Sequence, residues 1–308
     1  MKIAVYGAGG VGAYFGGRLA RAGADVHLIA RGTHLEALQK NGLEVESVFG
    51  DFSVDLPATD DPADIGVCDL VLVCVKSFDT RSTAREMEPL LGDETAVLSL
   101  QNGVDNEEKL AEEIGRERVL GGVTYIFSTI AEPGAIEHTD GPARIIYGEL
   151  EGGRSERVER FHDLCERAEG MEGVLSEDVR TEIWNKYALI VAVSGVTAAI
   201  RLPMGAIRDV EESWDLFVDL LYEVQDIAAA EGVTVSDDVI EEWIDFARDF
   251  ERDTYSSLHY DMTHGKRMEL EALQGTVVRK ADVHGVDVPR TRAVYSILRP
   301  WAVKNAGD

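Results

Sequence analysis

The pattern of apolar and polar positions divides the chain into two regions of different character. In the first region, short apolar runs of strand type lie at residues 2–6, 25–30, 70–76 and 95–100, with two more at 119–130 and 144–148. Helical periodicity separates them, through residue 21 and over 81–91 and 106–114. Strands that alternate with helices predict a doubly wound parallel sheet, because each parallel crossover usually carries a helix.

From about residue 177 helical periodicity dominates. It predicts helices over residues 181–199, 213–231, 237–254, 267–284 and 291–304. The polar stretch 169–178, which carries Gly170 and Gly173, is the predicted linker. We therefore expect an α/β domain over residues 1–172 and an all-helical domain over residues 173–308, and a length of 308 residues is typical of two domains.

The net charge of the chain argues against nucleic acid and membrane surfaces as partners. Its 57 acidic residues against 30 basic ones give a formal net charge of -27, which repels nucleic acid and anionic membrane surfaces. The acids are spread along surface-facing segments and lysine is scarce, a composition that resembles the cytoplasmic proteins of halophiles. An ordinary acidic protein is the alternative interpretation.

Nothing in the sequence predicts a membrane span, a signal peptide or a metal site. No apolar run approaches the roughly 20 residues that cross a bilayer, so we expect a cytoplasmic protein. Three cysteines show neither a disulfide framework nor metal-ligand spacing and are expected to be buried thiols: Cys68, Cys74 and Cys165. Three histidines of the helical region share no ligand spacing either: His259, His264 and His284.

The first candidate site is a glycine-rich loop between the first strand and the first helix. It matches G-x-G-x-x-G in a Rossmann-type setting, with glycines for the tight turn, the close approach of a pyrophosphate and helix–strand packing. The amides at the N-terminus of the helix would face the anionic cofactor. The residues predicted to bind it are Gly7, Ala8, Gly9, Gly10, Val11 and Gly12.

The end of the second strand favours one nucleotide over another. The chain reads HLIAR there, with Arg31 where an NAD enzyme usually has a carboxylate for the ribose 2′-hydroxyl. A guanidinium suits a 2′-phosphate and therefore favours NADPH. The alternative is an arginine that is merely exposed to solvent.

Two further polar side chains follow strands of the predicted sheet. Ligands of open α/β sheets bind beyond the carboxyl ends of the strands, where Lys76 and Asn102 are expected. Each also has an ordinary interpretation, since Lys76 would suit a solvated strand end and Asn102 stands in an Asn-Gly turn.

Taken together, these motifs resemble those of a known family. GAGGVG at 7–12, VKS at 75–77, QNG at 101–103, WNK at 184–186, and SSLHYD at 256–261 with RMELEALQG at 267–275 are similar, in order and spacing, to the ketopantoate reductases, or 2-dehydropantoate 2-reductases. The resemblance covers nearly the whole chain. It implies NADPH-dependent reduction of the 2-oxo acid 2-dehydropantoate to (R)-pantoate, on the route to pantothenate and coenzyme A.

The resemblance also implies roles for individual residues. It makes Lys186 the general acid, Glu269 a catalytic-site carboxylate and Ser257 a contact to the substrate carboxylate. Lys76 and Asn102 would border the nicotinamide and the substrate. The chemistry is reasonable by itself, since hydride addition to a ketone leaves an alkoxide, and a partly desolvated lysine can supply its proton. The alternative for Lys186 is a snorkelling side chain at the start of a helix.

The sequence departs from the family pattern one and two helical turns after Lys186. The family usually has asparagines at these two positions, where this chain has Ile190 and Ser194. Isoleucine can neither donate nor accept a hydrogen bond. Either nearby polar groups such as Thr197 or Asn185 compensate, or the pocket accepts a less polar 2-oxo acid.

Two rival interpretations stay open at this point. The 3-hydroxyacid dehydrogenases have a similar nucleotide loop and helical second domain, but they typically pair the lysine with an asparagine one turn later, where this chain has Ile190. An NADPH-binding regulator without turnover is the other reading. Whether the chain forms a homodimer cannot be predicted from these patterns.

Overall fold

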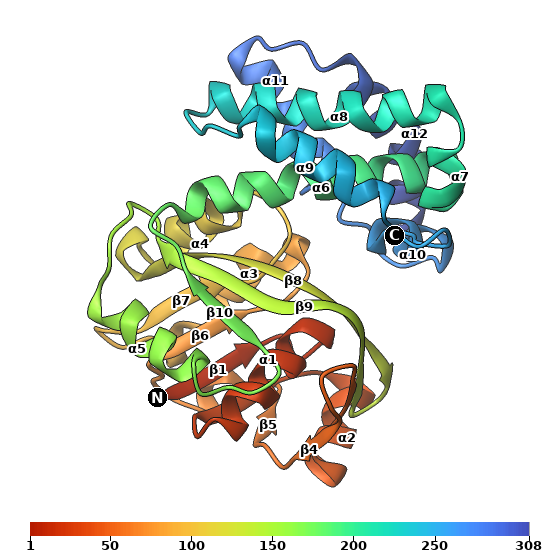
Figure 1. Ribbon diagram of the computed structural model, residues 1–308. Helices are drawn as coiled ribbons and strands as arrows, with labels where there is room; N and C mark the ends of the chain where they lie inside the picture. Colours follow the sequence, from red (N-terminus) through yellow and green to blue (C-terminus); the bar gives the residue numbers. More distant parts are fainter. Residues whose placement is uncertain (308) are drawn as a thin grey trace. The chain divides into compact units, whose positions relative to one another are not determined.

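The computed structural model describes residues 1–307, and the chain packs as two units (Figure 1). The first comprises Met1–Gln101 and Asn106–Val179. The second comprises Asn102–Asp105 and the chain from Arg180 onward. The domain boundary that the sequence predicts after residue 172 differs from the division between these units and stays a prediction.

The first unit is built on one mixed sheet. Its strand order is β4-β3-β9-β8-β7-β6-β1-β2-β5, with β10 paired to β9. All neighbouring strands are parallel except the β8–β9 and β3–β4 pairs. The bounds are β1 (Lys2–Tyr6), β2 (Asp25–Ile29), β3 (Leu43–Ser47), β4 (Phe52–Val54), β5 (Ala58–Thr59), β6 (Leu70–Val73), β7 (Ala96–Ser99), β8 (Val119–Glu132), β9 (Ala135–Glu149) and β10 (Glu172–Leu175).

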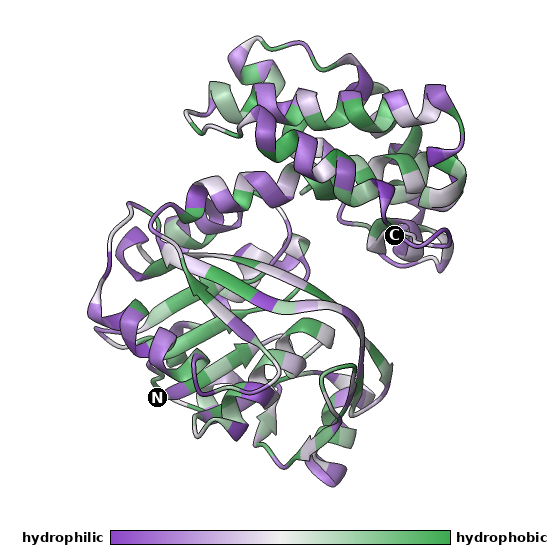
Figure 2. Cartoon of the chain, viewed as in Figure 1, coloured by the Kyte–Doolittle hydropathy of each residue, from purple (hydrophilic) through white to green (hydrophobic). Residues whose placement is uncertain are grey.

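Both faces of the central strands are covered, as the continuous apolar runs predicted. Along β1, Ile3 and Val5 join one buried cluster, while Ala4 and Tyr6 join another on the opposite face. Figure 2 shows these central strands coloured as hydrophobic. The helices of this unit are α1 (Gly10–Arg21), α2 (Gly32–Asn41), α3 (Thr80–Glu86), α4 (Asn106–Ile114) and α5 (Glu156–Cys165). The predicted Rossmann-type doubly wound sheet is therefore confirmed.

The second unit is all-helical, which confirms the other half of the predicted fold class. Its helices are α6 (Val179–Ile200), α7 (Met204–Arg208), α8 (Glu211–Ala230), α9 (Asp237–Arg248), α10 (Ser257–Thr263), α11 (Gln274–His284) and α12 (Pro289–Asn305). The N-terminus of α12 is capped from α8, because the Glu223 carboxylate accepts hydrogen bonds from the amides of Arg290 and Thr291 at 2.8 and 2.7 Å.

From Trp184 onward, most of helix α6 is apolar and belongs to the buried core of the second unit. By length and composition alone it could cross a membrane, so the statement that no apolar run is long enough was too strict. In the fold, 72% of its most apolar stretch is buried, which is the behaviour of a core helix.

Several sequence predictions about secondary structure were wrong in detail, and α2, β3, β4, β5 and α5 were not predicted. Residues 172–175 of the predicted linker form β10, because Gly173 lets the chain lie against Cys165, where a Cβ would come within 2.4 Å of the Cys165 Cβ. The helix predicted over 267–284 begins only at Gln274, and the one over 237–254 ends at Arg248. Periodicity does not show where a helical pattern gives way to a turn.

The three cysteines are free thiols, as predicted. Cys68 and Cys165 are buried and Cys74 is half-buried. Burial raises the pKa of Cys68 to about 11 and that of Cys165 to about 12. At neutral pH these thiols are protonated and therefore weak nucleophiles.

Candidate active site

The glycine loop has the close packing that its spacing predicted. Gly7 has φ +99°, and a Cβ on it would lie 2.8 Å from the backbone nitrogen of Val75. A Cβ on Gly12 would lie 2.3 Å from the Gly7 carbonyl oxygen. A side chain at Gly7 would therefore push the loop away from the segment after β6, and one at Gly12 would push α1 away from the loop.

Gly9 differs from its neighbours because its surroundings are open. It is the N-cap residue of α1, in extended backbone conformation, and nothing lies within 4 Å of the position where a Cβ would be. The amides of the first helical turn have no carbonyl partner four residues back within the helix, so they can donate to an anion. The open space over Gly9 and these amides fit a cofactor pyrophosphate.

His34 fixes this loop from the other side and was not among the predicted residues. Its Nδ1 accepts a hydrogen bond from the Gly134 amide at 3.1 Å, so its Nε2 carries the hydrogen and donates to the Ala8 carbonyl at 2.8 Å. Burial lowers the pKa of His34, which favours this neutral form. No motif signals the contact, because Gly134 lies 100 residues away along the chain.

Arg31 stands just beyond the end of β2, at the N-cap position of α2. Its Nη2 donates to the Glu86 carboxylate of α3 at 3.1 Å, and the Tyr6 hydroxyl donates to the same oxygen at 2.8 Å. The Arg31 side chain is 69% exposed. The guanidinium can therefore exchange Glu86 for another anion, and Glu86 is a residue that the sequence analysis missed.

Lys76 is exposed and lies three residues beyond the end of β6. The loop that carries it is tied to the end of β7 by Gln101, whose amide nitrogen donates to the Val75 carbonyl and to the Thr80 hydroxyl, both at 2.9 Å. Gln101 was part of the QNG motif but was not assigned a role.

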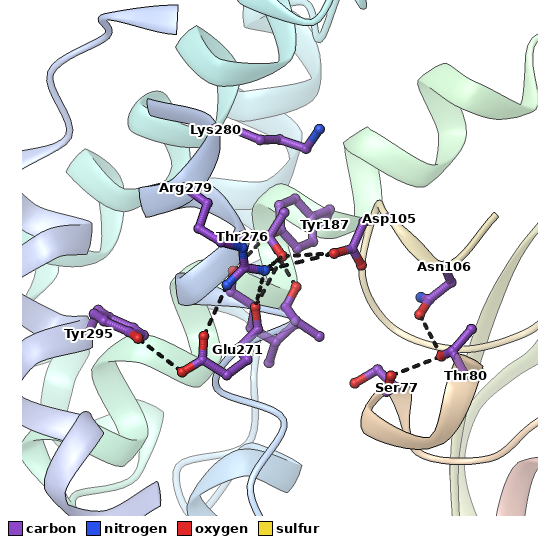
Figure 3. Close-up of polar contacts among 12 residues, drawn as sticks. Ser77, Thr80, Asp105, Asn106, Tyr187, Glu271, Thr276, Arg279, Lys280 and Tyr295 are labelled. Atoms are coloured by element: carbon purple, nitrogen blue, oxygen red, sulfur yellow. Dashed lines mark hydrogen bonds and ion pairs between the residues drawn. The ribbon is translucent and has the colours of Figure 1, made fainter. Parts of the chain in front are cut away.

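The Thr80 hydroxyl completes this link. It lies 2.9 Å from the Ser77 carbonyl oxygen and 3.2 Å from the Asn106 side-chain oxygen (Figure 3). The buried residues on both sides of segment 102–105, Gln101 and Asn106, are therefore bonded to one threonine. This arrangement fixes the two strand-end loops within the first unit.

In the second unit, two of the predicted residues, Asn102 and Glu269, interact with Lys186. Its ammonium donates to the side-chain oxygen of Asn102 at 2.8 Å. Burial lowers the pKa of Lys186 from 10.5 to about 8, and the Glu269 carboxylate partly restores it. This lysine is mostly protonated at neutral pH, yet it gives up its proton far more readily than an exposed lysine does.

Glu269 lies in a turn that precedes α11, where a helix was predicted. It is buried, and its carbonyl oxygen accepts from the amides of Ala272 and Leu273 at 3.1 Å. Tyr187 pins this turn to α6, because its hydroxyl lies 2.6 Å from the Leu273 carbonyl oxygen. Tyr187 is adjacent to Lys186 in sequence, but its apolar neighbours gave no sign of this contact.

Ile190 and Ser194 follow Lys186 on α6, as the spacing required. Ile190 is half-buried and packs against the core of the second unit, and Ser194 is almost fully buried. The structure thus keeps an apolar side chain one turn after the lysine.

Of the two residues considered as compensation, Thr197 is already engaged. It is fully buried, and its hydroxyl lies 2.7 Å from both the Val193 carbonyl oxygen and the Ser256 hydroxyl. The side-chain oxygen of Asn185, in contrast, is buried and has no hydrogen-bond partner within residues 1–307. Asn185 is therefore the one of the two with an unused acceptor.

Ser257 is exposed and is the first residue of α10. The cap of this helix is the preceding residue, Ser256, whose hydroxyl accepts from the His259 amide at 3.1 Å. Because that hydroxyl also contacts Thr197 on α6, the start of α10 is fixed to α6. The contact of Ser257 with a substrate carboxylate stays a prediction.

Two family models match this sequence. Residues 3–152 match "Ketopantoate reductase PanE/ApbA", and residues 178–302 match "Ketopantoate reductase PanE/ApbA C terminal". Together they cover most of both units.

Individual relatives agree with these matches. A 2-dehydropantoate 2-reductase of Halobacterium salinarum is 33% identical over 97% of this chain and 98% of its own length. An uncharacterized oxidoreductase of Bacillus subtilis, YkpB, is 30% identical over 98% of this chain and 99% of its own. The crystal structure of a ketopantoate reductase of the PanE/ApbA family from Ralstonia eutropha superimposes with a TM-score of 0.91, at 35% identity, over 99% of this chain and 100% of that one.

Proposed function

Because this chain belongs to the ketopantoate reductase family, we propose that it reduces 2-dehydropantoate to (R)-pantoate with NADPH, a step toward pantothenate and coenzyme A. The observation that carries this proposal is the group formed by Asn102, Lys186 and Glu269 in the second unit. A lysine of lowered pKa between an amide oxygen and a carboxylate is suited to protonating a nascent alkoxide.

In this proposal Lys186 is the general acid. Reduction of the ketone leaves negative charge on its oxygen, and the Lys186 ammonium first stabilises that charge and then donates a proton to the same oxygen. Glu269 keeps the lysine protonated before the reaction, since it raises the pKa that burial lowers. Asn102 accepts one of the ammonium hydrogens and thereby orients the group.

The first unit would hold the cofactor, which supplies the hydride when it is bound. The amides of the first turn of α1 and the open space over Gly9 suit its pyrophosphate. Arg31 supports NADPH over NADH, because a 2′-phosphate can replace the Glu86 carboxylate on an exposed guanidinium. Lys76, on the loop that Gln101 holds, is assigned to the nicotinamide or substrate side by its place after β6.

A second candidate has the same chemistry but a less polar 2-oxo acid as substrate. It is favoured by Ile190, which presents no hydrogen-bonding group at the position where relatives usually have an asparagine. Losing one such contact costs on the order of 1–3 kcal/mol of discrimination when the partner group stays unpaired. The side-chain oxygen of Asn185 has no partner within the described residues. If this oxygen accepts the hydrogen bond that Ile190 cannot make, the second candidate loses its support.

The test is cofactor oxidation measured by absorbance with 2-dehydropantoate and a panel of other 2-oxo acids, with NADPH and with NADH. Lys186→Met is the catalytic control, and Lys280→Met is the matched control on a lysine that instead pairs with Glu231 at 2.6 Å. Turnover of 2-dehydropantoate that only Lys186→Met abolishes would support the proposal. Turnover of another 2-oxo acid alone would select the second candidate. NADPH binding without turnover of any 2-oxo acid would indicate that the protein is an NADPH-binding regulator.

A further inference from the structure

The segment Asn102–Asp105 connects the end of β7 to α4, yet it packs with the second unit. Asn102 at one end accepts the hydrogen bond from Lys186, and Val104 packs against the helical core. Gly103 lies between Asn102 and Val104 and has φ +121°, a value that glycine adopts readily because it has no side chain. The apolar contact of Val104 is non-directional.

Asp105, at the other end of the segment, supplies a directional contact. Its Oδ2 lies 3.4 Å from the hydroxyl of Thr276 and 3.8 Å from Nη2 of Arg279, both on α11 (Figure 3). Thr276 is almost fully buried, and the Asp105 side chain is only 15% exposed. The hydrogen bond is a long one, and the guanidinium beside it adds an attraction of opposite charges that low exposure strengthens.

The partners of Asp105 are themselves held in place. Arg279 Nη2 donates to the Thr276 hydroxyl and to the Glu271 carbonyl, both at 2.8 Å, and its Nη1 donates to the Glu271 carboxylate at 3.0 Å. Tyr295 of α12 donates to the other Glu271 oxygen at 2.9 Å. The Thr276 oxygen accepts from Arg279, and its single proton is available to Asp105 or to the Glu271 carbonyl oxygen, 3.1 Å away.

A hydrogen bond from Tyr187 connects the turn before this network to α6, the helix that carries the proposed proton donor. Tyr187, the neighbour of Lys186, donates to the carbonyl of Leu273 in the turn that leads from Glu269 into α11. Along the chain, Glu269 precedes Leu273, and Thr276 and Arg279 follow it on α11. The segment that carries Asn102 and the turn that carries Glu269 are therefore both connected to α11.

We propose that Asp105 is a positioning residue: by binding Thr276 and Arg279 it holds segment 102–105 so that the Asn102 side-chain oxygen stays in place to accept from Lys186. The inference rests on the proposed function in that Lys186 is the proton donor. Asp105 acts through Asn102 and need not touch the substrate. The competing explanation is that Asp105 only adds stability to the second unit.

The test is a double-mutant cycle of Asp105→Ala and Asn102→Ala in the full-length protein. Two quantities are measured: kcat for the 2-oxo acid, and the pKa of Lys186 from the pH dependence of its acetylation by acetic anhydride, followed by peptide mass spectrometry. The second needs no substrate. Asp105→Asn, which keeps an oxygen acceptor for Thr276 but removes the charge, is the conservative control.

If Asp105 acts through Asn102, each alanine variant lowers kcat by about tenfold or more, as misplacement of a catalytic group does. Each also lowers the pKa of Lys186 by about half a unit, because the ammonium loses an acceptor. The double variant is then no worse than Asn102→Ala alone, and Asp105→Asn stays close to the parent protein.

If the losses of kcat in Asp105→Ala and Asn102→Ala add in the double variant, the proposal is overturned. It is also overturned if Asp105→Ala leaves the pKa of Lys186 unchanged. An Asp105→Asn variant that behaves like Asp105→Ala would overturn anchoring through the Thr276 hydrogen bond, since only the ion pair with Arg279 would then hold the segment. A parent protein that turns over no 2-oxo acid, together with a non-additive titration cycle, would refute the proposed function and leave the positioning role standing.

Discussion

Lys186 combines a catalytic advantage with a cost in stability. Its native pKa of about 8 lies below the unfolded value of 10.5, so between these pH values the unfolded chain binds more protons than the native one. The desolvation cost of the ammonium is therefore fully present below about pH 8 and is relieved as the pH rises toward 10.5. Removing the charge should help folding while it harms turnover.

We predict that Lys186→Met lowers kcat by on the order of 10²–10⁴ and raises the melting temperature at neutral pH. The gain in melting temperature should shrink as the pH rises through about 8, where the lysine of the parent protein loses its proton. Thermal melts of both proteins across this range check it. A variant that is less stable than the parent at neutral pH would contradict the argument.

The same pKa predicts the pH dependence of turnover. Because reduction needs the protonated lysine, kcat/KM in the direction of ketone reduction should fall as the pH rises through about 8. The Lys280→Met control should show the same alkaline limb as the parent protein. A rate that stays level well above this pH would exclude Lys186 as the proton donor.

At Arg31, the Glu86 carboxylate occupies the place that a 2′-phosphate would take. Both side chains are largely exposed, at 69% and 48%, so their ion pair is worth about 0–1 kcal/mol. Glu86→Gln should therefore lower the KM for NADPH by about twofold to fivefold and leave the KM for NADH unchanged. Arg31→Met should remove the preference for NADPH. Equal changes for both cofactors would show that Arg31 does not contact the phosphate.

At the scale of elements, the glycine loop between β1 and α1 contains one glycine that the fold needs and another that is expected to serve cofactor binding. Gly12 packs against the Gly7 carbonyl, whereas the space over Gly9 is open. The same chemical change, glycine to alanine, should thus have different consequences at two positions three residues apart.

We predict that Gly12→Ala lowers the melting temperature, since its Cβ would lie 2.3 Å from the Gly7 carbonyl oxygen. Gly9→Ala should keep the melting temperature of the parent protein and weaken NADPH binding, because the new methyl group enters the space assigned to the pyrophosphate. Calorimetric melts and cofactor titration of both variants test this pair. Unchanged NADPH affinity in Gly9→Ala would place the pyrophosphate elsewhere.

The elements also show where periodicity was sufficient and where it failed. It located α6 within two residues at each end, because an unbroken apolar pattern marks a core helix. It missed β10 and placed Glu269 on a helix. In both cases the backbone follows a contact with a distant segment, β9 for the strand and Tyr187 for the turn, and local pattern does not record such contacts.

At the scale of the whole molecule, the net charge of -27 opposes the compact state through self-repulsion. Salt screens this repulsion, with a Debye length of about 10 Å at 0.1 M that falls to about 3 Å at 1 M. We predict that the melting temperature rises steeply between low and molar KCl. Sucrose of equal osmolality is the control for excluded-solute effects, and a melting temperature that KCl raises no more than sucrose does would favour an ordinary acidic protein.

The sequence by itself indicated the alternation of strands and helices in the first unit, the all-helical class of the second and the candidate residues of the site, although it missed α2, β3, β4, β5, α5 and β10. Strand and helix periods, glycine spacing and the lysine at the start of α6 are local properties, and each is readable within a window of a few residues. The family followed from the same motifs, since their order along the chain is also a property of the sequence.

Only the tertiary structure decided what those residues contact. It paired Arg31 with Glu86, bonded His34 to Ala8 of the glycine loop and brought Asn102 and Glu269 to Lys186. Glu86, for instance, lies 55 residues from Arg31 and is one of many surface acids that look alike in the sequence. The pKa of Lys186 is likewise a tertiary property, because burial and a carboxylate 83 positions further along the chain together produce it.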